Sequence, residues 1–245
     1  MSTRDLDMVE QTISKATEVA VRSQLDEVED LQVEIHTDAV RLAGGQVDKL
    51  TVSGSGLVVK NDLRTDSLDL EARSIDVNML KAALGEIELE QPAKASTKVV
   101  LKAEDIQKAF NSNYVKKKLR GQKIDLPSGD RVTTDASNVE FTIPEAGKIV
   151  VAADVMLIEN VEKHHVSFSA KPKLVDGGNA MSLEEIEYDE ATNDMPGLTR
   201  SLIDSTQDLL DLRNFEIGEM SLQFDSVDVQ PGKIIIQARA TITSL

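Results

Sequence analysis

Histidine and cysteine side chains often carry nucleophilic, acid–base or metal chemistry, and this chain holds few of them. Its 245 residues include no cysteine and three histidines, His36, His164 and His165. Without cysteine, thiol catalysis, zinc–thiolate sites and iron–sulfur clusters are excluded. His164 and His165 are neighbours, so on a strand they point to opposite faces and cannot share a metal ion. The sequence therefore predicts no catalytic residues, no metal site and no cofactor.

Glycine pairs at 44–45 and 54–56 suggest a phosphate-binding loop at first sight. The pair Gly54 and Gly56 lacks the third glycine of a dinucleotide-binding loop, because Val59 stands at that position. No Gly-x-Ser-x-Gly motif is present, so a hydrolase of the α/β type has no nucleophile. We interpret these glycines as turn or bulge residues and predict that the protein is not an enzyme.

The charge of the chain argues against nucleic acid as a partner. It carries 27 basic and 43 acidic residues, a net charge of −16, and has no tryptophan for base stacking. Against this background, the run at 116–123 is strongly basic. Its cations are Lys116, Lys117, Lys118, Arg120 and Lys123. They could meet an anionic membrane, where each is worth about 1 kcal/mol, or they could simply be the solvated end of a helix.

The elements that would position such residues begin with an amphipathic helix. From Thr3 to about Arg22, apolar residues recur at spacings of three and four, as on one helix face. The polar face lacks the cationic and aromatic bias of helices that lie on membranes. We therefore expect this long helix to pack against the protein's own sheet.

Strands dominate the rest of the chain. From Leu31 onward, short segments alternate apolar with polar residues and are separated by turn signals, one of them at 54–56. This pattern predicts about a dozen antiparallel strands with one covered face. Helices are expected at 79–84, from 103 to about 119, and at 198–212. The order of elements favours an α+β fold, and without a Ser/Pro-rich linker we expect a single domain over 1–245.

Several segments, in order, resemble the LmeA-like phospholipid-binding proteins, a bacterial family formerly of unknown function. The segments that carry this resemblance are 42–50 (LAGGQVDKL), 54–59 (GSGLVV), 84–89 (LGEIEL) and 99–106 (VVLKAEDI). It runs from about Glu18 to Leu119 and more loosely to the C-terminus. It implies a TULIP-like architecture, in which a strongly curved antiparallel sheet wraps around a long amphipathic helix and holds acyl chains in an apolar groove.

The resulting hypothesis is non-enzymatic binding of a phospholipid or similar amphiphile, for transfer or storage. The residues expected to line the groove are Ile13, Val33, Val52, Leu57, Leu68, Leu70, Val99 and Val151. The alternative is an acidic protein-interaction or scaffold domain whose core is filled by the same side chains. The sequence contains no signal peptide or transmembrane segment, which favours the cytoplasm, with peripheral membrane contact.

Overall fold

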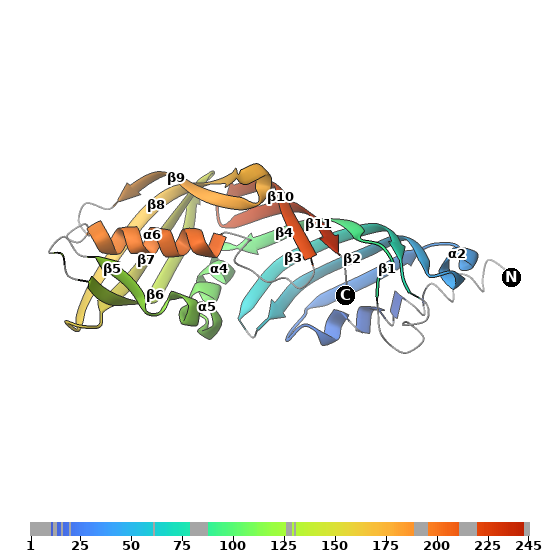
Figure 1. The fold of residues 1–245 in the computed structure, drawn as a ribbon, viewed down its shortest axis with the longest axis horizontal. Helices are drawn as coiled ribbons and strands as arrows, with labels where there is room; N and C mark the ends of the chain where they lie inside the picture. The colour runs from blue at the N-terminus through green and yellow to red at the C-terminus, as the bar shows by residue number, and fades with distance from the viewer. Residues whose placement is uncertain are drawn as a thin grey trace.

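The structure is a computed structural model, and it describes residues 11, 14–15, 17–19, 21–60, 62–78, 88–125, 129, 131–188, 196–210 and 220–242. Within these ranges, two antiparallel sheets lie end to end in an elongated molecule (Figure 1). Most of these residues belong to strands, and the helices between them are short. The fold is thus mostly antiparallel sheet with few helices, as the alternating pattern predicted.

The larger sheet has six strands and combines the two ends of the chain. In spatial order they are β1 (Asp30–His36), β2 (Gln46–Val59), β3 (Leu63–Asp76), β4 (Ala93–Lys102), β11 (Lys233–Ile242) and β10 (Met220–Gln230). The short helix α2 (Ala39–Ala43) connects β1 to β2, and Asp38 caps it by accepting hydrogen bonds from the amides of Val40 and Arg41, both at 2.9 Å.

One face of this six-stranded sheet is almost entirely apolar. Residues paired across antiparallel strands point to the same face, so the register defines rows that cross the sheet. The first row is Leu31, Gly54, Leu68, Val99, Ile236 and Val227. The second is Val33, Val52, Leu70, Thr97, Ala238 and Phe224. The third is Ile35, Leu50, Ala72, Ala95, Ala240 and Leu222.

The opposite face of the same sheet is mostly polar and charged, with Val100 and Ile235 as an aliphatic pair on it. Glu71 on β3 lies 2.7 Å from the Nζ of Lys49 and 2.6 Å from the Nε of Arg73. These two hydrogen bonds, that of Lys49 first, hold the pKa of Glu71 below its usual range. Farther across, Arg239 on β11 pairs with Asp225 on β10 at 2.7 Å. The sheet therefore presents one aliphatic and one mostly polar and charged surface.

The second sheet has five strands and curls into a half-barrel. Its order is β5 (Gln122–Asp125), β6 (Arg131–Glu145), β7 (Lys148–Leu157), β8 (Glu162–Val175) and β9 (Ala180–Tyr188), with the single-turn η1 (Asp176–Gly178) before β9. Helix α6 (Pro196–Leu210) lies along this sheet (Figure 1). Leu198, Leu202 and Ile203 of α6 join the buried side chains of β6, β7 and β8 in one core. A space of only about 10 Å³ remains beside Leu198, so this core is filled.

Two short helices stand between the sheets where the sequence predicted one. They are α4 (Ala103–Phe110) and α5 (Asn113–Leu119), and the helix expected from 103 to about 119 is interrupted at residues 111–112. Ser112 caps α5 by accepting a hydrogen bond from the amide of Val115 at 3.1 Å. The Asn111 amide group donates to the Val139 carbonyl at 2.6 Å and accepts from the Val139 N–H at 3.1 Å. These side-chain bonds replace a continuation of the helix and attach it to β6.

A network of charged side chains joins the six-stranded sheet to α4. Arg64 on β3 donates from Nη1 to the Oδ2 of Asp105 at 2.9 Å and from Nη2 to the Oε1 of Glu29 at 2.7 Å. The hydrogen bonds to Glu29 and then to Asp105 raise the pKa of Arg64. The Asp105 side chain is only 1% exposed, whereas its second cation, Lys108, lies 3.7 Å away. Arg64 is therefore the closer partner of a buried carboxylate.

Other expectations for the fold need correction or lie outside the described residues. Residues 54–56 do not form a turn: they lie inside β2, where Gly56 has a φ of +59° while the pairing with β3 keeps its register. The long helix predicted over 3–22 is not confirmed, because residues 1–10 lie outside the described part of the chain. Of the described residues that follow, 11, 14–15, 17–19 and 21–23 are helical. The helix expected at 79–84 lies outside the described residues, and that at 198–212 corresponds to α6.

Candidate functional site

The apolar face of the six-stranded sheet is covered unevenly. Toward β1, Leu31 and Val33 are 3% and 6% exposed and form a buried cluster on which Val21 and Leu25 of the N-terminal segment pack. Ser14 of that segment accepts a hydrogen bond from the Ile35 amide at 3.1 Å. The N-terminal segment thus covers the β1 side of this face.

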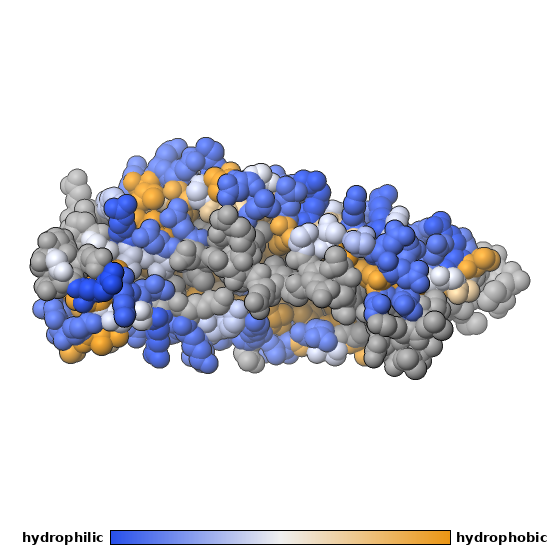
Figure 2. Space-filling view, in the orientation of Figure 1, coloured by the Kyte–Doolittle hydropathy of each residue, from blue (hydrophilic) through white to orange (hydrophobic). Residues whose placement is uncertain are grey.

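The middle of the first row is less covered than its β1 end. Half-buried aliphatic side chains follow one another there on β3, β4, β11 and β10, with Leu70 beside them on β3. We name these five residues the apolar strip: Leu68, Leu70, Val99, Ile236 and Val227. Figure 2 shows hydrophobic surface over β2 and β3, set back from the surrounding atoms. The strip retains partial solvent contact, as do Leu50 and Leu222 in the third row of the same face.

The structure brings together most of the residues predicted to line a groove. Leu68, Leu70 and Val99 belong to the apolar strip. Three others lie on the same sheet but inside the buried cluster around Leu31; they are Val33, Val52 and Leu57. These six residues therefore form part of one continuous aliphatic surface.

Two of the predicted groove residues do not join this surface. Val151 lies on β7 of the other sheet and is 0% exposed within the filled core, so it is not grouped with the strip. Periodicity could not distinguish the two sheets, because both alternate in the same way. Ile13 lies outside the described residues. Ile236 and Val227, which the sequence analysis did not select, complete the row through their register with Val99.

Two hollows lie elsewhere, and each has charged side chains in its lining. One of about 900 Å³ lies on the charged face of the six-stranded sheet, against Glu71, Arg73 and Arg239. Another, of about 420 Å³, lies at the edge of β1, where Lys15, Glu34 and the predicted groove residue Val33 are part of its lining. Hydrocarbon placed against such side chains would leave charged groups without water. The hollow against Glu71, Arg73 and Arg239 is therefore unsuited to an acyl chain.

The predicted basic run is divided between α5 and β5. Lys116 is half-buried, whereas Lys117, Arg120 and Lys123 are exposed, and the side chain of Lys118 lies outside the described part of the chain. The Nε of Arg120 lies 3.5 Å from the Oδ2 of Asp135 on β6. The run thus follows one side of the five-stranded sheet, and its contact with a membrane stays a prediction.

The three histidines do not come together at one site. His36 lies on β1, 3.6 Å from Glu34, and His164 lies on β8, 3.6 Å from Glu162. His165, the next residue, faces Asp154 on β7 at 3.2 Å. Among the residues that the structure describes, no group of three or more histidine, aspartate or glutamate side chains is arranged to hold a metal ion.

Asp154 is held by three neighbours and gives a test of stability against pH. It lies 2.8 Å from the Nζ of Lys163, 2.7 Å from the Nδ2 of Asn138 and 3.2 Å from the Nδ1 of His165. These hydrogen bonds, that of Lys163 first, lower the pKa of Asp154 far below its usual value of 3.8. Because the folded pKa is the lower one, the stabilisation is complete above about pH 4 and is lost as the pH falls toward the folded pKa.

The substitution Asp154→Asn should therefore lower the free energy of unfolding at neutral pH by about 1–2 kcal/mol. The difference from the unsubstituted protein should shrink as the pH falls below about 4. Urea unfolding followed by circular dichroism at neutral pH and near pH 3 measures both quantities. If the two proteins differed in their free energy of unfolding by the same amount at both pH values, the lowered pKa of Asp154 would not be the cause of that difference.

Comparison with known proteins gives one match. The family model described as LmeA-like phospholipid-binding matches residues 6–239. No curated protein and no solved structure matches the chain. Within the described ranges, none of the helices has the length and apolar character needed to cross a bilayer.

Proposed function

Because the chain belongs to the LmeA-like phospholipid-binding family, we propose that it holds an acyl chain of a phospholipid along the apolar strip. The observation that carries this proposal is the half-buried row of Leu68, Val99 and Ile236 on an aliphatic face whose β1 end is buried. A filled core would hold these side chains out of water, as the core of the five-stranded sheet does. An acyl chain on the strip would complete their burial.

The length of the strip is suited to one acyl chain. From Leu68 on β3 to Val227 on β10 the row crosses three strand spacings, which amount to about 14 Å. One leaflet contributes about 15 Å to the hydrocarbon core of a bilayer, and an acyl chain spans one leaflet. Each buried methylene contributes about 0.8 kcal/mol. Eight of them would contribute about 6 kcal/mol before the costs of binding are subtracted.

The proposed role is retention or transfer of lipid, without covalent chemistry. The strip consists of aliphatic side chains, which offer dispersion and area burial but no directional bonds. Such contacts select little between lipids with different acyl chains, and they permit release, as a carrier requires. The competing role, a protein-interaction domain with a filled core, predicts that no lipid reaches the strip.

The position of the lipid can be tested with two single cysteines, because the natural chain has none. Val99 and Lys98 are neighbours on β4 and point to opposite faces of the sheet. Each of the variants Val99→Cys and Lys98→Cys would be labelled with a polarity-sensitive fluorophore and mixed with phosphatidylglycerol vesicles.

The emission of the label at 99 should shift to shorter wavelength when lipid is added, while that of the label at 98 stays unchanged. The Lys98→Cys protein is the matched control, because its label differs only in the face that it occupies. Equal shifts at both positions, or none at either, would argue against an acyl chain on the strip.

A further inference from the structure

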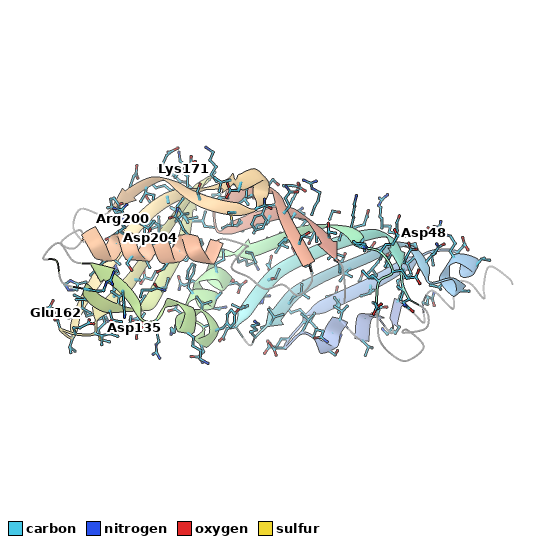
Figure 3. The ribbon with its side chains drawn as sticks, viewed as in Figure 1. Asp48, Asp135, Glu162, Lys171, Arg200 and Asp204 are labelled. Atoms are coloured by element: carbon cyan, nitrogen blue, oxygen red, sulfur yellow. The ribbon has the colours of Figure 1, made fainter. Side chains whose placement is uncertain are left out.

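The tip of the β7–β8 hairpin carries apolar side chains that face water. Ile158 is 48% exposed and Val161 is 78% exposed, and Met156 beside them is 37% exposed. Figure 2 shows a hydrophobic patch rimmed by hydrophilic surface at the lower left end of the molecule, where Figure 3 labels Glu162 of the same hairpin. Exposed apolar residues gathered at one projecting turn indicate a contact surface.

The backbone conformation at Val161, within this tip, is also unfavourable for a valine. Val161 has a φ of +57°, in the left-handed region. A β-branched side chain is among the least suited to that conformation, which glycine or asparagine adopts more easily. Since Val161 is exposed, packing within the protein does not explain why an apolar side chain stands there. Strain without a packing gain is typical of positions retained for function.

Charges of both signs lie beside the apolar tip: Glu159 belongs to the turn itself and Glu162 directly follows it. Lys123 on β5 is paired with Thr133 on β6, and the Thr133 carbonyl accepts the Ile158 N–H at 3.0 Å. Lys123 therefore lies one strand away from Ile158. Lys163 is paired with Met156 across β7 and β8, but its Nζ lies 2.8 Å from the Oδ2 of Asp154, so it is already neutralised. The nearby Glu159 carboxylate accepts hydrogen bonds from the Thr133 amide at 2.8 and 3.0 Å, which lower its pKa.

From these observations we propose that the β7–β8 tip docks on an anionic phospholipid bilayer. Ile158 and Val161 enter the interfacial region, and Lys123 meets the lipid head groups. Three apolar side chains are too few for a stable protein–protein interface, which buries at least about 1,200 Å². Projecting apolar side chains suit the interfacial region of a bilayer, and Lys123 suits its anionic head groups, although Glu159 lies in the turn, Glu162 directly follows it and the protein as a whole carries a charge of −16. Docking of this kind is weak and reversible.

Because the chain has no tryptophan, an introduced one reports its own surroundings. We would compare Ile158→Trp with Val40→Trp, which replaces a residue that is 84% exposed on α2, near the opposite end of the molecule (Figure 1). Each variant would be mixed with phosphatidylglycerol vesicles whose acyl chains carry bromine, a quencher of tryptophan.

The emission of Ile158→Trp should shift to shorter wavelength and lose at least half its intensity, whereas that of Val40→Trp should not change. This contrast is expected because docking buries the tip and leaves α2 in water. Equal quenching of both variants, or quenching of neither, would overturn the proposal.

A second variant separates the membrane contact from folding. Val161→Gly removes the apolar side chain and fits the left-handed backbone, so the unfolding midpoint should rise by about 2–4 °C. Its affinity for the same vesicles should nevertheless fall about tenfold, as expected for the loss of one buried valine. Unchanged affinity in a stably folded Val161→Gly protein would contradict docking through this tip.

The docking proposal extends the proposed function, but the two can fail separately. Val161→Gly should still bind a short-chain phosphatidylglycerol dispersed below its micelle concentration, since no bilayer is then involved. If neither the natural chain nor Val161→Gly binds that lipid, the strip proposal fails while the vesicle measurements still decide on docking.

Discussion

Replacement of Leu68 and Val99 together by glutamine should lower the affinity for phospholipid about 100-fold. The two residues are paired across β3 and β4, so both changes fall at one point of the apolar strip. Each substitution removes aliphatic contact with an acyl chain and adds an amide that the chain cannot satisfy. Titration of the variant with a fluorescent phosphatidylglycerol measures the effect.

The matched control for this variant lies on the opposite face of the same strands. Asp69 and Lys98 are the next residues along β3 and β4 and are paired with each other in the same register. The variant Asp69→Asn with Lys98→Gln should bind phospholipid as the natural chain does. If the Leu68→Gln, Val99→Gln protein keeps its fold by circular dichroism and its affinity is unchanged, lipid does not bind at the strip.

Loss of Arg64 should be the most damaging change outside the buried core. Arg64→Ala leaves the Asp105 carboxylate, which is 1% exposed, with Lys108 at 3.7 Å as its one cation among the residues that the structure describes. Removal of one partner of a buried ion pair costs about 3 kcal/mol, because the remaining charge is poorly compensated. Urea unfolding at neutral pH should show this loss in the free energy of unfolding.

Arg239→Ala provides the comparison for Arg64→Ala. Arg239 also contacts a carboxylate at 2.7 Å, but its side chain is 62% exposed and that of Asp225 is 37% exposed. Exposed pairs of this kind contribute about 0–1 kcal/mol. Similar losses in the two variants would mean that burial of Asp105 does not determine the effect of Arg64.

The sequence was informative about strands because each one has a covered and an exposed face. Alternation from Leu31 to Ile35 predicted β1, and pairing of Leu31 with Gly54 then places Leu68 and Val99 on the same face. Alternation cannot say whether that face is covered by protein or by a ligand. The five-stranded sheet shows the same pattern around Val151, and there α6 and α4 fill the space.

The missed features depend on contacts that a single segment does not reveal. The helix predicted from 103 to about 119 is interrupted because Asn111 bonds to Val139, a residue distant in sequence. The β7–β8 tip left a local signal, since Leu157 and Ile158 break the alternation of β7 and Val161 follows within the turn. The exposure of Ile158 and Val161 became evident only from the position of the hairpin at the end of the molecule (Figure 3).

Native mass spectrometry of the protein purified from the cells that make it tests the central claim most directly. We expect about one phospholipid per chain, released when the complex is collisionally activated, and little or none on the Leu68→Gln, Val99→Gln protein. A natural chain that carries no lipid and takes none up from vesicles would contradict binding at the strip. That result would favour the alternative role, a protein-interaction domain with a filled core.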